Sequence, residues 1–501
     1  MSLLKKLAGD TVLYGLSSIV GRLLNWLLVI VHTRIFEQPR LLADNAQLYT
    51  YVIPLNIIFT FGMETAFFRY GSKKENQSDV FSLLLTALIL WGGTLSLLFV
   101  LFATPLINAI GYPGKEHLIY WMSAILWLDT IAALAFVKLR AQNKAKRFVG
   151  IKLINIFINI FLNAFFLIFC NYILQGLFLS ELTPFARFFY NPALGPDYII
   201  VANLVASLST ILLLYPQFSD FKWTIAYEKL KPILKYAFPL VIMGLAGAVN
   251  LTADRLLFRS FLPAGFYPGQ STDDAFSVYA QVYKLSIFMA LVVQAYRYAA
   301  DPLFFSKMGD KNSPALIALS THWFTLACLI IWLGVSINLD WIGLLIGSTY
   351  RSGLLVVPLL LLANLFIGVY GNISIWLKLI DKTQIGTWIT LTGMSVAVVS
   401  NILLIPKFGY VGCAISACLS SFIMCLLAYL LGQKYFPIPY KTVRLITYTT
   451  LTGALIWVIP QWNFSSAVTN ATLHIGITIA WATLLIYLER KSLKSTIHAT
   501  L

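Results

Sequence analysis

Long apolar segments recur along the whole chain, separated by short polar loops. Their hydropathy predicts fourteen membrane spans, because about 20 consecutive apolar residues are needed to cross a bilayer as a helix. We expect every span to be a helix, since a segment in lipid must satisfy its own backbone hydrogen bonds. The predicted limits are 11–31, 47–69, 80–108, 118–137, 150–172, 198–216, 236–258, 276–298, 314–336, 353–377, 385–405, 411–433, 443–460 and 470–488.

The basic residues of the loops predict the orientation of these spans. If the N-terminus is cytoplasmic, the loops on its side carry 23 lysines and arginines, and the opposite side carries 7. Cytoplasmic loops have an excess of basic residues, so we expect both termini in the cytoplasm. Lys5 and Lys6 precede the first apolar run, which shows no convincing cleavage site. We therefore expect that run to be a retained span, not a signal peptide.

Composition supports a membrane protein without a sizeable soluble domain. Charged residues make up 11% of the chain, against roughly 25% in soluble domains. The net charge of +16 lies mainly in the loops, where membrane orientation explains it more simply than nucleic-acid binding does. The five cysteines lie in apolar stretches without metal-ligand spacing, which indicates packing roles. They are Cys170, Cys328, Cys413, Cys418 and Cys425.

Short sequences recur in the same order in the two halves of the chain, as in transporters built from repeats. The pairs are Tyr14-Gly15 with Tyr236-Ala237, Leu48-Tyr49 with Val278-Tyr279, and Asn143-Lys144 … Asn163 with Asp381-Lys382 … Asn401. Their offsets of 222, 230 and 238 residues grow in steps, as loop insertions would produce. The pattern predicts an all-α membrane protein with two pseudo-symmetric six-helix lobes plus two C-terminal helices, and a cavity between the lobes.

The repeat and the loops together predict the domain limits. We expect an N-terminal six-helix lobe over 1–216, a cytoplasmic interlobe linker over 217–235 and a C-terminal six-helix lobe over 236–433. Two additional transmembrane helices and a cytoplasmic tail would occupy 434–501.

Six basic residues fall inside or at the edge of the predicted spans, namely Arg22, Arg69, Lys152, Arg255, Lys284 and Arg297. An ionised side chain at the bilayer centre costs at least ~2.5–3.5 kcal/mol, so such residues normally face water or a partner. Five of the six lie in the first two spans of each half, where they would line a shared cationic cavity. Arginine holds phosphate and pyrophosphate by bidentate hydrogen bonds.

The predicted substrate-binding residues are Arg22, Arg255, Lys284, Arg297 and Arg69. Glu64 and Asp254 are the candidates for ion coupling.

Plainer explanations exist for these residues. Arg69, Lys152, Arg255 and Arg297 lie near span ends and could reach the headgroups. Arg22 could form a structural salt bridge, and Asp254 could pair locally with Arg255. The chain shows no P-loop, no GxSxG motif and no His/Cys metal cluster. We therefore expect no enzyme activity, catalytic residue, metal or cofactor, and transport driven by a gradient or the membrane potential.

The chain resembles the multidrug/oligosaccharidyl-lipid/polysaccharide (MOP) exporter superfamily over nearly its whole length. The resemblance rests on the two halves, on Lys5-Lys6 … Tyr14-Gly15 … Gly21-Arg22, and on Leu139-Arg140-Ala141-Gln142-Asn143-Lys144. That last motif is similar to the LRA-x-x-(K/R) loop of polysaccharide flippases and is echoed by Leu377-Lys378-Leu379 … Lys382. Within the superfamily, the sequence looks most like bacterial O-antigen and capsule flippases.

That resemblance implies a flippase in the bacterial cytoplasmic membrane. Its substrate would be an undecaprenyl-pyrophosphate-linked oligosaccharide, moved between leaflets by alternating access for polysaccharide biosynthesis. The implied partners are this lipid-linked oligosaccharide, membrane lipids and polysaccharide polymerase or glycosyltransferase machinery, with no nucleic acid.

Other functions remain open on the sequence. Lipid II flippases also have fourteen spans and a basic first-helix residue similar to Arg22, but they often have Asp where Leu23 stands here. Cation-coupled multidrug exporters of the superfamily usually have twelve spans and acidic ion sites. A membrane scaffold or an embedded glycosyl polymerase is a further alternative, although polymerases generally carry a large periplasmic loop and no loop here exceeds about 25 residues.

Overall fold

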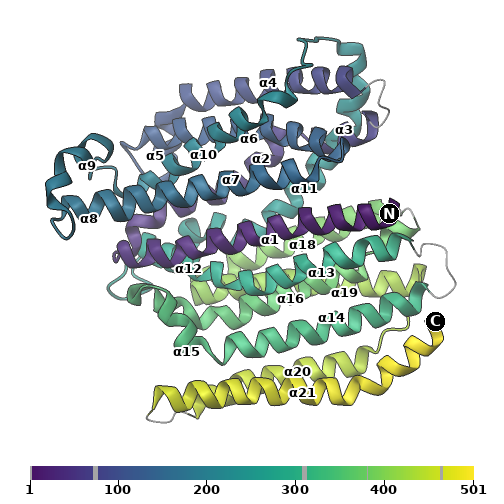
Figure 1. Cartoon of the computed structure of the whole chain (residues 1–501). Helices are drawn as coiled ribbons and strands as arrows, with labels where there is room; N and C mark the ends of the chain where they lie inside the picture. Colours follow the sequence, from purple (N-terminus) through teal and green to yellow (C-terminus); the bar gives the residue numbers. More distant parts are fainter. Residues whose placement is uncertain (1–2, 72–76, 307–312, 381, 463–465, 501) are drawn as a thin grey trace. The chain divides into compact units, whose positions relative to one another are not determined.

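The computed structural model describes residues 3–71, 77–306, 313–380, 382–462 and 466–500, which are helical throughout apart from turns and loops (Figure 1). Thirteen helical segments in this part of the chain are long and apolar enough to cross a membrane, and they match predicted spans 2 to 14. The first predicted span lies inside α1 (Leu3–Ile35), a helix of 33 residues. The predicted fold class is therefore confirmed. Asp381 and the side chains of Lys5, Lys6 and Tyr14 lie outside the described part.

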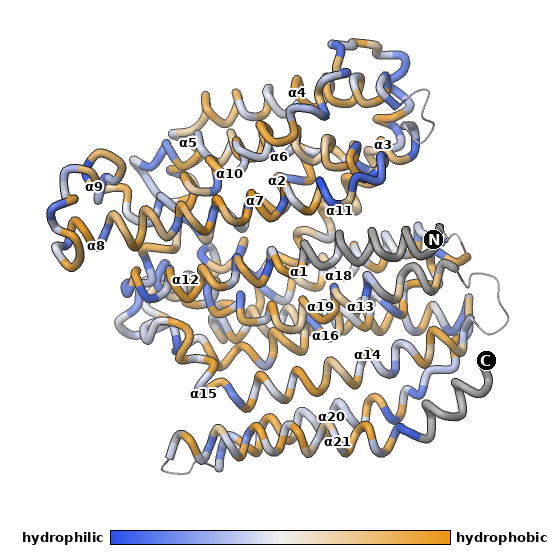
Figure 2. Tube along the Cα trace, in the orientation of Figure 1, coloured by the Kyte–Doolittle hydropathy of each residue, from blue (hydrophilic) through white to orange (hydrophobic). Residues whose placement is uncertain are grey.

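The chain divides into two compact units, Met1–Thr252 and Ala253–Leu501. The predicted lobes, linker and added helices form a finer division, which stays a prediction. Apolar residues run along the helices of both units, and hydrophilic residues gather at helix ends and in loops (Figure 2).

In the first unit, α6 packs against α2, α4 and α10, while α7 packs against α1 and α10. Phe67, Phe81, Leu134 and Val137 are fully buried in one of its apolar clusters. A π-helix, η3 (Ala164–Cys170), continues α7 without interruption into α8. The helices are α2 (Ala43–Thr60), α3 (Met63–Tyr70), α4 (Gln77–Leu101), α5 (Ala103–Ile110), α6 (Glu116–Ala141), α7 (Ala145–Asn163), α8 (Asn171–Leu174), α9 (Thr183–Phe189), α10 (Tyr198–Leu214) and most of α11 (Tyr227–Phe261).

The second unit repeats this packing pattern. Here α19 packs against α16 and α18, just as α10 packs against α6 and α7 in the first unit. Likewise, α14 packs against α16 as α4 packs against α6. The last two helices, α20 and α21, lie side by side in Figure 1, and both contact α14. The helices are α12 (Thr272–Tyr283), α13 (Ile287–Ser306), α14 (Ser313–Ser336), α15 (Leu339–Ile342), α16 (Val357–Ile373), α17 (Trp376–Leu379), α18 (Thr383–Phe408), α19 (Tyr410–Tyr435), α20 (Thr442–Val458) and α21 (Ala467–Thr500).

The backbone supports the predicted repeat most directly at the 139–144 motif. Asn143 has a left-handed φ of 55°, a conformation that asparagine tolerates better than most residues. The Lys144 N–H donates to the Leu139 carbonyl at 3.0 Å, and the Asn143 N–H donates to the Arg140 carbonyl at 3.0 Å. These two bonds form a Schellman cap that ends α6. At an offset of 238 residues, the Lys382 N–H donates to the Leu377 carbonyl at 2.9 Å.

Two buried asparagines, Asn163 and Asn401, occupy equivalent places 238 residues apart. Their amides each donate to the carbonyl four residues earlier, of Asn159 and Ala397, at 2.8 Å. Asn163 also lies 2.9 Å from Nε2 of His32, which connects α7 to α1. An amide in an apolar span is thus partly satisfied within its own helix, as burial of a polar group requires.

The beginning of the predicted interlobe linker is attached to the first unit. Lys138 is almost fully buried, and its ammonium donates to the Gln217 carbonyl at 2.8 Å. The backbone N–H groups of Lys222 and Thr224 donate to the Ser82 and Thr86 hydroxyls of α4, each at 3.2 Å. Hydroxyl groups on the apolar helix α4 therefore hold the beginning of the predicted linker in place.

Lys115, one of the few basic residues on the side away from the basic loops, is held by acidic partners. Its ammonium contacts Asp44 and lies 3.4 Å from Asp197. Partial burial lowers the pKa of Lys115, but the two carboxylates outweigh it and the pKa is raised overall. Nε2 of His117 lies 2.9 Å from Asp197, so this network joins the ends of α2, α6 and α10.

Replacement of Asn143 tests the cap. Asn143→Val should lower stability by about 1–2 kcal/mol, because a β-branched residue disfavours the left-handed conformation. Asn143→Gly is the matched control and should leave stability unchanged or slightly higher. The measurement is the thermal unfolding midpoint of the detergent-purified protein. Equal midpoints for the valine variant and the unsubstituted protein would contradict the role assigned to this cap.

Candidate functional site

The predicted site residues are divided between the two units. Arg22, Glu64 and Arg69 lie in the first unit, and Asp254, Arg255, Lys284 and Arg297 lie in the second. Each set is described within its own unit.

Arg22 is exposed on α1, the helix that packs against α7. The neighbouring Gly21 is buried, and a Cβ there would lie 2.7 Å from Ile156 of α7. Gly21 and His32 are buried and contact α7, at Ile156 and Asn163, whereas Arg22 and Leu23 are exposed. The glycine therefore permits close packing of α1 and leaves the guanidinium beside it outside the packed interface.

Glu64 has a partner that the sequence analysis did not identify. The predicted second span is broken at Phe61 and Gly62, whose φ angles of 46° and 66° are left-handed, and Glu64 stands at the start of the short helix α3 that follows. Its carboxylate lies 3.2 Å from the guanidinium of Arg140, in the 139–144 motif. Arg140 also lies over the ring of Phe68, 5.3 Å from its centroid.

Arg69 is exposed at the other end of α3 and interacts with aromatic rings instead of a carboxylate. Its guanidinium carbon lies 4.2 Å from the ring centroid of Tyr236 and 5.8 Å from that of Tyr70. Cation–π contacts of this kind hold an arginine in place without neutralising its charge. Tyr236 belongs to the predicted repeat, but its contact with Arg69 could not be inferred from the repeat.

In the second unit, Asp254 is buried and surrounded by donors. The Tyr279 hydroxyl donates to its carboxylate at 2.5 Å, and the backbone N–H of Arg255 donates to it at 2.8 Å. The Arg255 guanidinium lies 3.4 Å from the same carboxylate and 4.0 Å from the ring centroid of Tyr283. Asp254 and Arg255 are thus a local ion pair, as the plainer explanation proposed.

Lys284 stands where the predicted eighth span is interrupted. A 3-10 turn, η7 (Lys284–Ser286), separates α12 from α13. The Lys284 side chain is exposed, and its ammonium donates to Gln281 Oε1 at 2.9 Å. The Arg255 guanidinium lies over the ring of Tyr283, the residue directly before Lys284. Arg255 and Lys284 are therefore close to each other. Arg297 is exposed farther along α13, and no contact among the described side chains connects it to this cluster.

Glu489, which the sequence analysis overlooked, is a fully buried carboxylate in α21. It accepts hydrogen bonds from Arg444 at 3.0 Å and Tyr448 at 2.9 Å. Nε2 of His322 lies 3.2 Å from its second oxygen. The cluster joins α21 to α20 and α14, and its contacts are structural in character.

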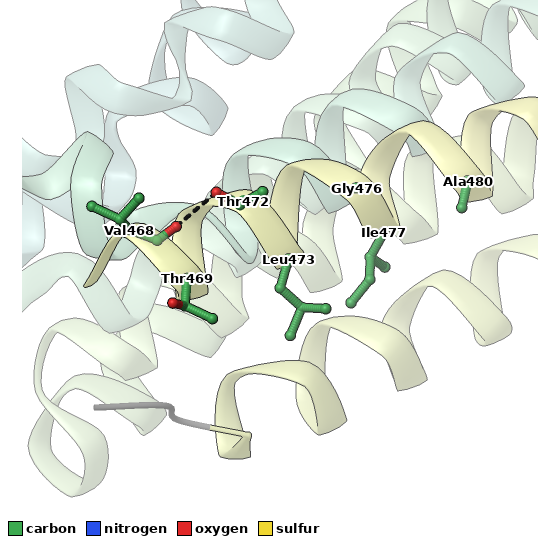
Figure 3. A pocket seen from close by; sticks show the side chains of 7 residues that line it. All are labelled: Val468, Thr469, Thr472, Leu473, Gly476, Ile477 and Ala480. Carbon is green, nitrogen blue, oxygen red and sulfur yellow. Dashed lines mark hydrogen bonds between the residues drawn. The ribbon is translucent and has the colours of Figure 1, made fainter. Parts of the chain in front are cut away.

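A shallow, open groove of about 600 Å³ runs along α21 (Figure 3). Its lining is apolar with two threonine hydroxyls, and no charged side chain lines it. It is therefore not the predicted cationic cavity. The lining residues are Val468, Thr469, Thr472, Leu473, Gly476, Ile477 and Ala480. No group of three or more His, Cys, Asp or Glu side chains in the described residues is arranged to hold a metal ion.

Comparisons with known proteins identify the fold. No protein-family model and no curated protein matches the sequence. The solved structure of the lipid II flippase MurJ in an inward closed conformation matches with a TM-score of 0.72, at 15% identity, over 96% of this chain and 100% of that one.

Two MATE transporters match less closely. An inward-facing multidrug resistance MATE family transporter of the MOP superfamily gives a TM-score of 0.60 at 13% identity, over 86% of this chain and 96% of its own. The Vibrio cholerae MATE transporter VcmN gives 0.56 at 16% identity, over 86% and 95%. The chain is therefore a multi-pass membrane protein with the fold that MurJ and MATE transporters share in the MOP superfamily.

Proposed function

We propose that the protein is a flippase that moves undecaprenyl-pyrophosphate-linked oligosaccharides across the bacterial cytoplasmic membrane by alternating access, for polysaccharide biosynthesis. The observation that supports this most is the exposure of Lys284 and Arg297 in a segment able to span the membrane, together with that of Arg22 in the predicted first span. Among the described side chains, none of the three forms an ion pair.

The cost of charge in lipid explains why this exposure matters. An arginine or lysine facing hydrocarbon is expensive, so such residues face water or an anionic ligand. A pyrophosphate carries several negative oxygens, which guanidinium groups bind with bidentate geometry. The polyprenyl chain of the proposed substrate would remain in lipid while the headgroup crosses beside these cations.

The acidic residues strengthen the case for an anionic substrate. Glu64 pairs with Arg140 at 3.2 Å, and Asp254 is bonded to Tyr279 and paired with Arg255. Carboxylates engaged in this way leave the remaining basic residues with a net positive charge. A multidrug exporter that binds a coupling cation at Glu64 or Asp254 would first have to break these contacts.

Lipid II is a second candidate substrate. The MurJ structure covers 96% of this chain, whereas the two MATE structures each cover 86%. The absence of an acidic residue after Arg22, where Leu23 stands, argues against it. Both candidates share the polyprenyl-pyrophosphate group, so the cationic residues would serve either one.

Arg22 is the most informative residue to replace. Arg22→Ala should abolish surface polysaccharide export in the native host while membrane abundance stays normal, because the exposed guanidinium is not part of the α1–α7 interface. Arg22→Lys keeps the charge and should retain part of the activity. Export is measured from extracted surface polysaccharide, and abundance by immunoblot. Full export by the alanine variant would remove Arg22 from the mechanism.

Complementation separates the two substrates. A bacterium depleted of its own lipid II flippase should not be rescued by this protein, whereas a strain lacking its polysaccharide flippase should regain surface polymer. Colony formation and polymer extraction are the two readouts. Rescue of the first strain and failure in the second would assign the protein to lipid II.

Glu64→Gln distinguishes pairing from ion coupling. The Glu64–Arg140 pair is partly exposed, and such pairs contribute about 0–1 kcal/mol. We therefore expect nearly normal stability and export in Glu64→Gln, with Arg140→Gln as the matched variant from the other side of the pair. Loss of transport in the first variant alone, at normal abundance, would instead indicate that the carboxylate couples an ion.

A further inference from the structure

An aromatic stripe runs along one face of α7 and η3 in the first unit. Phe157, Phe161, Phe165 and Phe169 are spaced four residues apart, and their rings are stacked in sequence with centroid separations of 6.3, 6.3 and 5.8 Å. Phe157 and Phe161 are exposed. None of these residues belongs to the predicted charged site.

The segment that follows α8 folds back onto this stripe. The rings of Phe185 and Phe189, in α9, make edge contacts with Phe165 at 6.5 and 5.9 Å. Tyr190 is buried and stacks on Tyr198 at 4.7 Å. The packing fixes the depth of the returning segment relative to α7.

Hydrogen bonds hold the end of the segment as well. The Asn191 N–H donates to the Tyr198 hydroxyl at 2.8 Å, and that hydroxyl donates to the Phe189 carbonyl at 3.3 Å. The Tyr198 ring also stacks on Phe166 of η3 at 4.5 Å.

The depth of this contact can be estimated along the helix. Arg147, an exposed residue in the first turn of α7, marks the level of the basic loop. Phe165 lies eighteen residues later, or about 27 Å at 1.5 Å per residue. The hydrocarbon core is about 30 Å thick. Phe165, and with it α9, therefore lies near the far edge of the hydrocarbon.

The outward side of the returning segment is strongly apolar. Phe188 is 82% exposed and Leu177 is 70% exposed, and Phe178 and Leu179 are also exposed. Exposed polar side chains, including those of Glu181 and Arg187, lie between these apolar residues in the same segment. Aromatic and apolar residues mixed with polar ones at this depth are typical of segments that lie in a membrane interface.

We propose that residues 175–190 form a membrane-interface cap, which inserts Phe188 and Leu177–Leu179 into the leaflet on the side away from the basic 140–147 loop. The partner is the lipid bilayer itself, at the boundary between headgroups and hydrocarbon. Because the cap rests on Phe165 and Tyr198, it fixes the level of that leaflet against the first unit. This inference requires only that the helices span a membrane, so it holds for any transported substrate.

Spin-label accessibility tests the cap. The five native cysteines are replaced by alanine, and a nitroxide is attached to Phe188→Cys in protein reconstituted into phosphatidylglycerol/phosphatidylcholine liposomes. Glu181→Cys is the matched polar position on the same segment, and Phe157→Cys, on the exposed stripe, is the hydrocarbon reference. Collision rates with oxygen and with a water-soluble nickel complex report the depth of each label.

The label at 188 should lose most of the nickel collisions seen at 181 and gain oxygen collisions toward the level at 157. Leu177→Cys should give the same result as Phe188→Cys. If the cysteine-free protein folds poorly, the same labels are compared in the native background, where the cysteines are buried or half-buried. Equal nickel access at 188 and 181, with 157 protected, would overturn the proposal.

Discussion

Every ionised side chain inside a bilayer needs either water or an opposite charge, and this requirement accounts for the polar contacts of both units. Glu64 meets Arg140, Asp254 meets Arg255 and Tyr279, and Glu489 is surrounded by donors from two other helices. The intramembrane carboxylates discussed here are thus engaged in contacts. Two of the basic residues differ from these carboxylates: Arg22 and Lys284 are exposed, and neither forms an ion pair with a described side chain.

The spans could be predicted well because hydropathy reports the same constraint directly. A span in lipid has to be helical and apolar over about 20 residues, whatever it packs against, so composition alone locates it. The 139–144 motif was recognisable for a related reason, since the cap at Asn143 depends on local backbone geometry that a few residues specify. The breaks at Phe61-Gly62 and at Lys284 were not predicted. Both interrupt apolar runs, and hydropathy does not distinguish a continuous helix from an interrupted one.

The sequence analysis predicted individual residues of the site but not the side chains that contact them. Sequence showed which charges fall inside spans, but their partners lie far along the chain: Arg140 is 76 residues from Glu64, and Tyr279 is 25 from Asp254. Spacing rules for helix faces reach three or four residues, so they could not find Arg140. The rings of Tyr236 and Tyr283 were missed because an aromatic residue in an apolar span gives no charge signal.

The two units share a backbone pattern but differ in chemistry. The closures at Leu139–Lys144 and Leu377–Lys382 and the amides of Asn163 and Asn401 repeat at one offset, whereas the cations do not. Arg22 lies on a continuous helix, while Lys284 stands at a 3-10 interruption beside Arg255. In the mechanism proposed above, the anionic headgroup would pass cations that both units supply. The repeat therefore preserves backbone geometry, while the positions and contacts of the cations differ between the two units.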